Sequence, residues 1–195
     1  TLDARLSGHV LLIEGSGAAP TVEGLRIING NGARAGAGGG ILVREGAAPT
    51  LQANVLEGNI ATYDPDGMQP GTGSGAGGAI GIYNAPGTRV LSNTLRANFA
   101  RVGGGLRIRQ SDNVLVQGNQ FLNNRAGDSG GGLSLDNSSV AIADNLLRGN
   151  LVESSNGRGG ALDIVGGAPT LRGNTVEQNS AAYGGGIAFD SDDAL

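Results

Sequence analysis

Apolar and polar residues alternate in short runs along most of the chain. From Ile41 to Val43, and again from Leu106 to Ile108, every second residue is aliphatic, which is the period of a β-strand with one buried face. Helical periodicity is absent, and the glycine pairs that recur beside these runs would destabilise a helix. The pattern therefore predicts many short strands and no helices.

The runs belong to a repeat with one fixed part and one variable part. A Gly-Gly-small-aliphatic motif occurs six times, and Gly8-His9-Val10 is a degenerate seventh copy. Each full copy except the last is followed by the pattern Asn-x-apolar-x-x-Asn. From the aliphatic residue of the first motif to the final asparagine of the second there are 17 or 18 residues, whereas the return to the next copy takes 8 to 21.

The fixed part predicts three inward-facing strand positions in each coil. The first strand would bury two residues per coil, and the next two strands one each. These positions are Ile41/Val43, Ile80/Ile82, Leu106/Ile108, Leu133/Leu135, Leu162/Ile164 and Ile187/Phe189 in the first strand, Leu51, Val90, Val116, Ile142 and Leu171 in the second, and Leu56, Leu95, Phe121, Leu147 and Val176 in the third. Short strands without crossover helices favour an all-β parallel solenoid of about seven coils, with residues 1–195 as one domain.

The paired asparagines predict two ladders at buried corners of the solenoid. Stacked carboxamides can hydrogen-bond from coil to coil at a spacing of about 4.8 Å, and asparagine tolerates left-handed turns. Glycine at the third corner would allow positive φ and a close approach of neighbouring coils. We assign these residues a structural role: Asn54, Asn59, Asn93, Asn98, Asn119, Asn124, Asn145, Asn150, Asn174 and Asn179.

The two motifs resemble the Gly-Gly-Ala-aliphatic and Phe-x-x-Asn repeats of chlamydial polymorphic outer-membrane proteins, and more broadly the bacterial right-handed β-helix repeat family. Phe121-Leu122-Asn123-Asn124 matches Phe-x-x-Asn literally, and leucine or valine replaces the phenylalanine elsewhere. The resemblance covers nearly the whole chain and implies a right-handed parallel β-helix. The residues that carry it form the fold, and the fold serves adhesins, lyases and hydrolases alike.

Composition narrows the classes of partner. Thirty-eight glycines and three phenylalanines, three tyrosines and no tryptophan do not describe an ordinary core, and a net charge of −4 disfavours nucleic acid and anionic membranes as partners. No cysteine is present, so disulfides and thiolate chemistry are excluded. The chain starts at Thr1 without a signal peptide, and no apolar run is long enough to insert into a membrane. We expect flanking sequence at both ends.

The variable segments, 32–37, 60–76, 99–102, 125–129, 151–158 and 180–183, are expected to form loops along one edge of the solenoid. The longest contains Tyr63, Asp64 and Asp66. Two carboxylates in an Asp-Pro-Asp-Gly turn make Asp64 and Asp66 candidate calcium ligands, because hard cations take carboxylate oxygens. A solvated turn without any cofactor is the alternative that we favour.

A second group of candidates lies on the outward face of the first strand. Tyr83, Arg107, Arg109, Asp136 and Asp163 would form a surface of aromatic, guanidinium and carboxylate groups suited to sugar hydroxyls. The competing interpretation is charge pairing between coils, Arg109 against Asp136, with a contribution under about 1 kcal/mol. No lysine is available, and the sole histidine, His9, replaces a corner glycine, so the usual acid–base set of a polysaccharide lyase is not evident.

We therefore expect an extracellular or cell-surface structural or adhesive module, without cofactor, rather than an enzyme. Its partners would be other copies, flanking coils, or a surface glycan or protein, met by a loop-lined edge or by end-to-end assembly. The alternative is a carbohydrate-binding or polysaccharide-cleaving domain that uses the outward face of the first strand.

Overall fold

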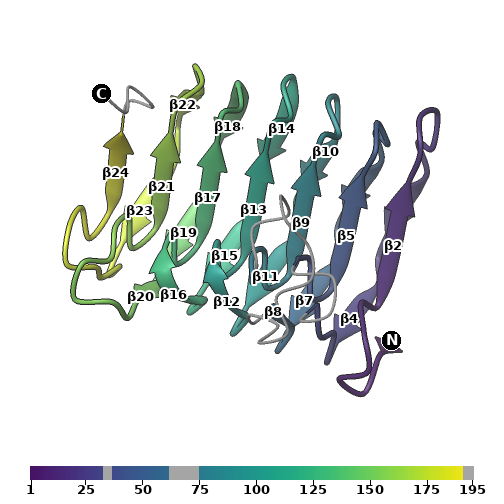
Figure 1. Cartoon of the computed structure of the whole chain (residues 1–195), viewed down its shortest axis with the longest axis horizontal. Coiled ribbons are helices and arrows are strands. Elements are labelled where there is room, and N and C mark those ends of the chain that lie inside the picture. Colours follow the sequence, from purple (N-terminus) through teal and green to yellow (C-terminus); the bar gives the residue numbers. More distant parts are fainter. Residues whose placement is uncertain (33–36, 62–74, 191–195) are drawn as a thin grey trace.

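The computed structural model describes residues 1–32, 37–61 and 75–190. These residues form stacked coils of short strands along one long axis, with the N-terminal coil at one end and the C-terminal coil at the other (Figure 1). Every strand pair is parallel. Within the described residues no helix is long and apolar enough to cross a membrane.

The strands form four sheets, named here A to D. Sheet B holds the strands that follow the glycine motif: β2 (Leu11–Glu14), β5 (Ile41–Arg44), β9 (Ile80–Tyr83), β13 (Leu106–Arg109), β17 (Leu133–Asp136), β21 (Leu162–Val165) and β24 (Ile187–Asp190). Sheet C comes next along the chain: β3 (Thr21–Glu23), β6 (Thr50–Gln52), β10 (Arg89–Leu91), β14 (Val114–Gln117), β18 (Val140–Ala143) and β22 (Thr170–Arg172).

Sheet A follows sheet C and completes the arc of fixed length. Its strands are β1 (Leu2–Asp3), β4 (Arg26–Ile28), β7 (Val55–Glu57), β11 (Thr94–Arg96), β15 (Gln120–Leu122), β19 (Leu146–Arg148) and β23 (Thr175–Glu177). Sheet D contains β8 (Ile60–Ala61), β12 (Phe99–Val102), β16 (Arg125–Ser129) and β20 (Leu151–Val152).

The parallel β-helix prediction is confirmed, and so is its register. Val90 pairs with Leu51 and Val116 in sheet C, Leu95 pairs with Leu56 and Phe121 in sheet A, and Ile108 pairs with Ile82 and Leu135 in sheet B. The seven strands of sheet B delimit six complete circuits, one fewer than the seven coils counted from the glycine motifs.

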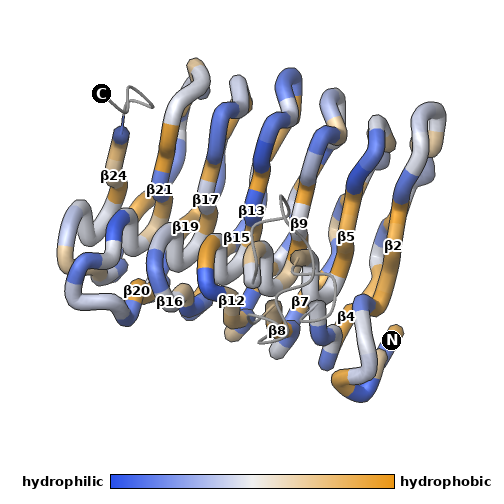
Figure 2. Tube along the Cα trace, in the orientation of Figure 1, coloured by the Kyte–Doolittle hydropathy of each residue, from blue (hydrophilic) through white to orange (hydrophobic). Residues whose placement is uncertain are grey.

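One apolar core runs through the inside of the coils from Ile13 to Ile164. Figure 2 shows the apolar strand positions separated by polar turns in coil after coil. Phe121 is the largest fully buried side chain, and around it aliphatic side chains stack on their counterparts in the next coil. Aliphatic stacking at the spacing of parallel strands thus replaces the aromatic packing that the composition excludes.

The asparagines form two ladders along the axis. Asn124 accepts hydrogen bonds at Oδ1 from the backbone N–H and Nδ2 of Asn98 (3.1 and 2.9 Å), and its Nδ2 donates to Leu95 O and to Asn150 Oδ1. The expectation that these asparagines are left-handed is wrong. The preceding residue has the positive φ, as at Asn123 (52°), and it turns the chain so that the carboxamide points inward.

The expectation of a loop-lined edge is also corrected by sheet D. Residues 99–102 and 125–129 are β12 and β16, which pair with each other in parallel with a register shift after Ala100. These segments show no apolar–polar alternation, because each strand buries only one small residue, Ala100 in β12 and Ala126 in β16. Ladder hydrogen bonds, more than side-chain pattern, hold these segments extended.

Candidate functional site

The outward residues of sheet B form two rows that run along the solenoid. In the first row Arg107 of β13 is in register with Ser134 of β17, which is in register with Asp163 of β21. In the second row Tyr83 of β9 is in register with Arg109, and Arg109 with Asp136. The parallel register therefore brings together the residues that the sequence singled out as binding candidates.

Two guanidinium groups share the carboxylate of Asp136. Arg107 Nη2 donates to Asp136 Oδ2 at 2.6 Å, and its Nη1 donates to Ser134 Oγ at 3.0 Å. Arg109 Nε lies 3.1 Å from the same Asp136 oxygen. The side chains of Arg107 and Asp136 are only 14 and 19% exposed, so water screens this cluster little. The predicted pairing of Arg109 with Asp136 is present, and Arg107 joins it.

Tyr83 does not present its ring to solvent. It is 7% exposed and packs in a small apolar cluster with Ala37, Leu42, Ala76 and Val102. Its hydroxyl lies 3.4 Å from the Ala76 carbonyl oxygen. Burial raises the pKa of Tyr83 to about 12, against the opposing effect of the nearby arginines. The sugar-stacking role expected for this ring is therefore not available to it in this conformation.

The residues that cover the Tyr83 side chain each lie directly before a glycine motif. Ala37, Ala76 and Val102 are joined by isolated parallel bridges, and the chain then bends sharply into sheet B. The backbone nitrogen of Gly38 consequently lies against the outer side of Gly81. Later coils carry Ser129, Arg158 and Tyr183 at this position. No apolar periodicity marks this row in the sequence, although its place immediately before the glycine motif is a usable signal.

Asp163 is a buried carboxyl beside a guanidinium. Its side chain is 4% exposed, and its Oδ1 lies 3.7 Å from Arg158 Nε, with no hydrogen bond to that oxygen among the described residues. Arg158 also pairs with Asp190 and donates from Nη2 to the Phe189 carbonyl oxygen at 3.0 Å. Burial raises the pKa of Asp163, and the Ser129 hydroxyl and the charges of Arg158 and Arg107 offset this only in part.

Asp163→Asn should stabilise the protein at pH 7. Because the folded-state pKa is raised, the ionised carboxylate weakens folding above that pKa, and the neutral amide removes this effect. The gain should be smaller at pH 4 than at pH 7, because the raised pKa makes the folded protein take up this proton before the unfolded chain does. Urea unfolding at the two pH values measures the difference, with the exposed Asp112→Asn as control. A gain at pH 4 equal to that at pH 7 would contradict the assigned cause.

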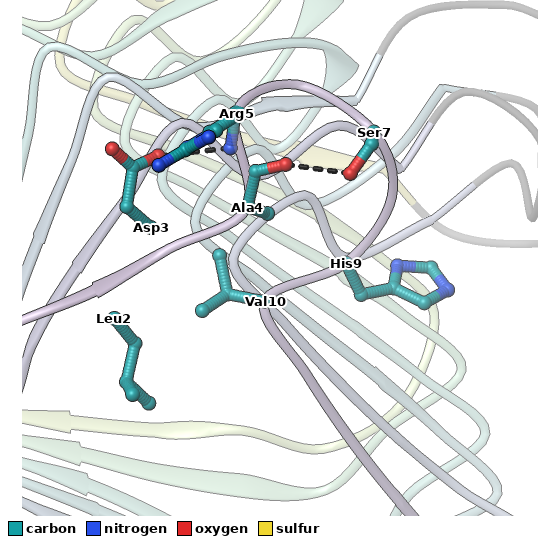
Figure 3. Close-up of a pocket in the computed structure, with 7 residues that line it drawn as sticks. All are labelled: Leu2, Asp3, Ala4, Arg5, Ser7, His9 and Val10. Carbon is teal, nitrogen blue, oxygen red and sulfur yellow. Dashed lines mark hydrogen bonds between the residues drawn. The ribbon is translucent and has the colours of Figure 1, made fainter.

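His9 is one of the residues of the first coil that line a hollow of about 420 Å³ at the N-terminal end, and its ring points away from Asp3 and Arg5 (Figure 3). His9 Nδ1 is 2.8 Å from the Gly38 carbonyl oxygen. The Ser7 hydroxyl donates to Ala4 O at 2.6 Å, and Asp3 accepts from the Arg5 backbone N–H at 2.8 Å. These contacts tie the first coil together, which favours a structural role for the histidine.

The remaining candidates, Tyr63, Asp64 and Asp66, lie outside the described residues. Among the residues that the structure does describe, no group of three or more acidic or histidine side chains is arranged to hold a metal ion. Calcium binding by Asp64 and Asp66 stays a prediction.

The geometry defines a class of protein: a parallel β-solenoid whose coils are joined by aliphatic stacks, asparagine ladders and a polar outer row. The chain belongs to the right-handed β-helix family, whose model matches residues 8–194. No curated protein matches the chain, and no solved structure does.

Proposed function

We propose that this β-helix is a rigid structural module of an extracellular or cell-surface protein, which joins further coils or a partner and holds its side faces at fixed spacing. The observation that carries the proposal is the direction of the polar contacts. The side-chain bonds of the two asparagine ladders run along the axis, from one coil to the next.

The ion pairs follow the same direction. Glu57 joins three successive coils, since it accepts from Arg96 Nη2 at 2.9 Å and from Arg26 Nη2 at 3.0 Å. The hydrogen bond from Arg96 and, to a smaller extent, the one from Arg26 lower the pKa of the Glu57 carboxyl. Other pairs between neighbouring coils include Arg101–Asp128, Arg107–Asp136, Arg125–Glu153 and Arg148–Glu177. Each exposed pair adds less than about 1 kcal/mol, but together they oppose sliding of the coils.

The outer row of sheet B supports the same proposal. Arg107, Arg109, Ser134 and Asp136 bind one another, and Tyr83 is covered. A surface that uses its polar groups internally is typical of a stabilising cluster. The similarity of the repeats to those of chlamydial polymorphic outer-membrane proteins supports a surface location.

Substitutions in this row should change stability and not ligand binding. Asp136→Asn leaves two partly buried guanidiniums without their carboxylate, and we expect a loss of about 1–3 kcal/mol of unfolding free energy. The exposed Arg89→Gln on β10 is the matched control and should change less than about 0.5 kcal/mol. Melting curves and a glycan array, run on all three proteins, test the proposal. It fails if wild type binds a glycan and Asp136→Asn abolishes this binding at an unchanged melting temperature.

A second candidate is polysaccharide binding or cleavage, and Asp163 is the observation that favours it. A buried carboxyl with a raised pKa beside an arginine is the kind of group that acts as a general acid. Release of unsaturated or reducing ends from uronate polymers, lost in Asp163→Asn, would support this function over the structural one.

A further inference from the structure

Three asparagines are each followed by glycine, in the steps Asn29-Gly30, Asn31-Gly32 and Asn156-Gly157. In such a step the backbone nitrogen of the glycine can attack the side-chain amide carbon of the asparagine. Glycine permits the attack because it has no side chain to block the approach and because its backbone angles vary widely. Asparagine is thermolabile for this reason. Whether a given step reacts depends on how the fold holds the nitrogen of its glycine.

Two of the three glycine nitrogens take part in hydrogen bonds between coils. The Gly30 N–H donates to Asn59 Oδ1 at 2.9 Å in a buried ladder, and the Gly32 N–H donates to Ile60 O at 2.8 Å. Both glycines are buried. An attack by either nitrogen therefore requires that two neighbouring coils first separate, which is an opening of high free energy.

The third step lies in a turn that follows β20. The Gly157 N–H donates to Ser154 O at 2.9 Å, and the Asn156 N–H donates to Ser154 Oγ at 3.2 Å. Both bonds close within the turn and join no second coil. Asn156 is exposed and Gly157 is buried, so the attack must follow a local opening of the turn. Such openings cost far less free energy than the separation of core strands.

The opening is confined to a few residues, because bonds between coils hold both ends of the turn. The Ser154 N–H donates to Gly127 O at 2.9 Å, and the Arg158 N–H donates to Asp128 O at 3.3 Å. The turn can therefore open while the stack stays folded.

We propose that Asn156 is a site of spontaneous deamidation in the folded protein, and that the fold protects Asn29 and Asn31 from the same reaction. The Gly157 nitrogen forms a bond to Asn156 Cγ, the Cγ–Nδ2 bond breaks, and the Gly157 proton leaves with the amide nitrogen as ammonia. One water molecule then opens the cyclic imide. Addition of water at Cγ gives aspartate, and addition at the backbone carbonyl carbon gives isoaspartate.

Both products place a new carboxylate two residues before Arg158. In isoaspartate the backbone also runs through Cγ, which lengthens it by one carbon atom. Arg158 forms parallel bridges with Ser129 and Tyr183, and its Nε lies 3.7 Å from Asp163 Oδ1. Deamidation thus changes the charge and the chain path beside this ion pair, independently of the proposed structural function.

The test is to keep the whole chain folded at pH 8 over several weeks and to map the products by peptide mass spectrometry. We expect the mass increase of an amide-to-acid conversion at Asn156, with aspartate and isoaspartate as separable products. The rate there should exceed the rates at Asn29 and Asn31 by at least about tenfold, because a local opening is far more frequent than the separation of coils. In concentrated urea, where the coils are unfolded, the three rates should become similar.

Asn156→Gln is the matched variant, because its longer side chain would have to close a larger ring, which forms much more slowly. It should lack the modification and keep the melting temperature of the wild type. Two outcomes would overturn the proposal. One is a rate at Asn156 no higher than at Asn29 and Asn31 in the folded chain, and the other is an unchanged ratio of the rates in urea, which would assign the difference to the local sequence and not to the fold.

Discussion

Asn124→Ala should lower the free energy of unfolding by about 3 kcal/mol or more. The substitution leaves the backbone N–H and Nδ2 of Asn98 without their acceptor and removes one donor to the Leu95 carbonyl, all at a fully buried corner. Each unsatisfied buried group costs about 1–3 kcal/mol. In a chain of this size the loss corresponds to a fall in melting temperature of about 6 to 12 °C, measurable by circular dichroism.

Gln120→Ala, four residues earlier and exposed on β15, is the control and should change the melting temperature little. Equal melting temperatures for the two variants would show that the asparagine ladder does not contribute to stability. Asn124→Asp separates the contributions further, because it retains the acceptor for Asn98 and the backbone N–H donor to Asn150, and loses only the Nδ2 donor to Leu95 O and Asn150 Oδ1.

Gly104→Ala should have a larger effect, with loss of cooperative folding or more than about 4 kcal/mol of unfolding free energy. A methyl group here would meet the carbonyl oxygen of Arg125 in the next coil and lie 2.5 Å from that of Gly131. Arg125 belongs to β16, and Gly131 lies in the bend before β17, where its N–H donates to Gly159 O. Neither backbone can move without disturbing hydrogen bonds between coils, and interiors packed this densely do not absorb such a shift.

Gly105→Ala is the matched control one residue away. A methyl group at Gly105 would lie 2.6 Å from the Gly132 carbonyl oxygen, so a small backbone shift is needed. The equivalent position holds alanine in two other coils, Ala79 and Ala161, so the fold accommodates a methyl group at this position. We expect this variant to fold cooperatively with a loss of at most about 1–2 kcal/mol. If the two variants unfold alike in guanidinium, the close approach of backbones at Gly104 is not what requires glycine there.

The pattern of the sequence was sufficient for the stacked coils because neighbouring coils are copies of each other. A period of two along each strand identified Leu106 and Ile108 as inward residues, and the repeat then aligned them with Leu133 and Leu135 without any knowledge of the turns. The ladder asparagines followed for the same reason. Their identity was predictable, but the assignment of the left-handed turn to them was not correct, since the preceding residue adopts it.

The burial of side chains on the outer surface depends on contacts that the alternation of apolar and polar residues does not predict. Tyr83 stood in an outward position, and its burial came from Ala37, Ala76 and Val102, which belong to segments of variable length. Asp163 is a buried carboxyl with Arg158 beside it, and Arg158 is the last residue of the segment 151–158, which the pattern predicted as a loop.

By itself, then, the sequence determined the coil, its register and its ladders, because these repeat and each copy reinforces the others. The tertiary structure alone decided the fourth sheet and the covering of Tyr83. Both depend on how the segments before the glycine motifs pack from one coil to the next, and the residues of a single repeat do not show this.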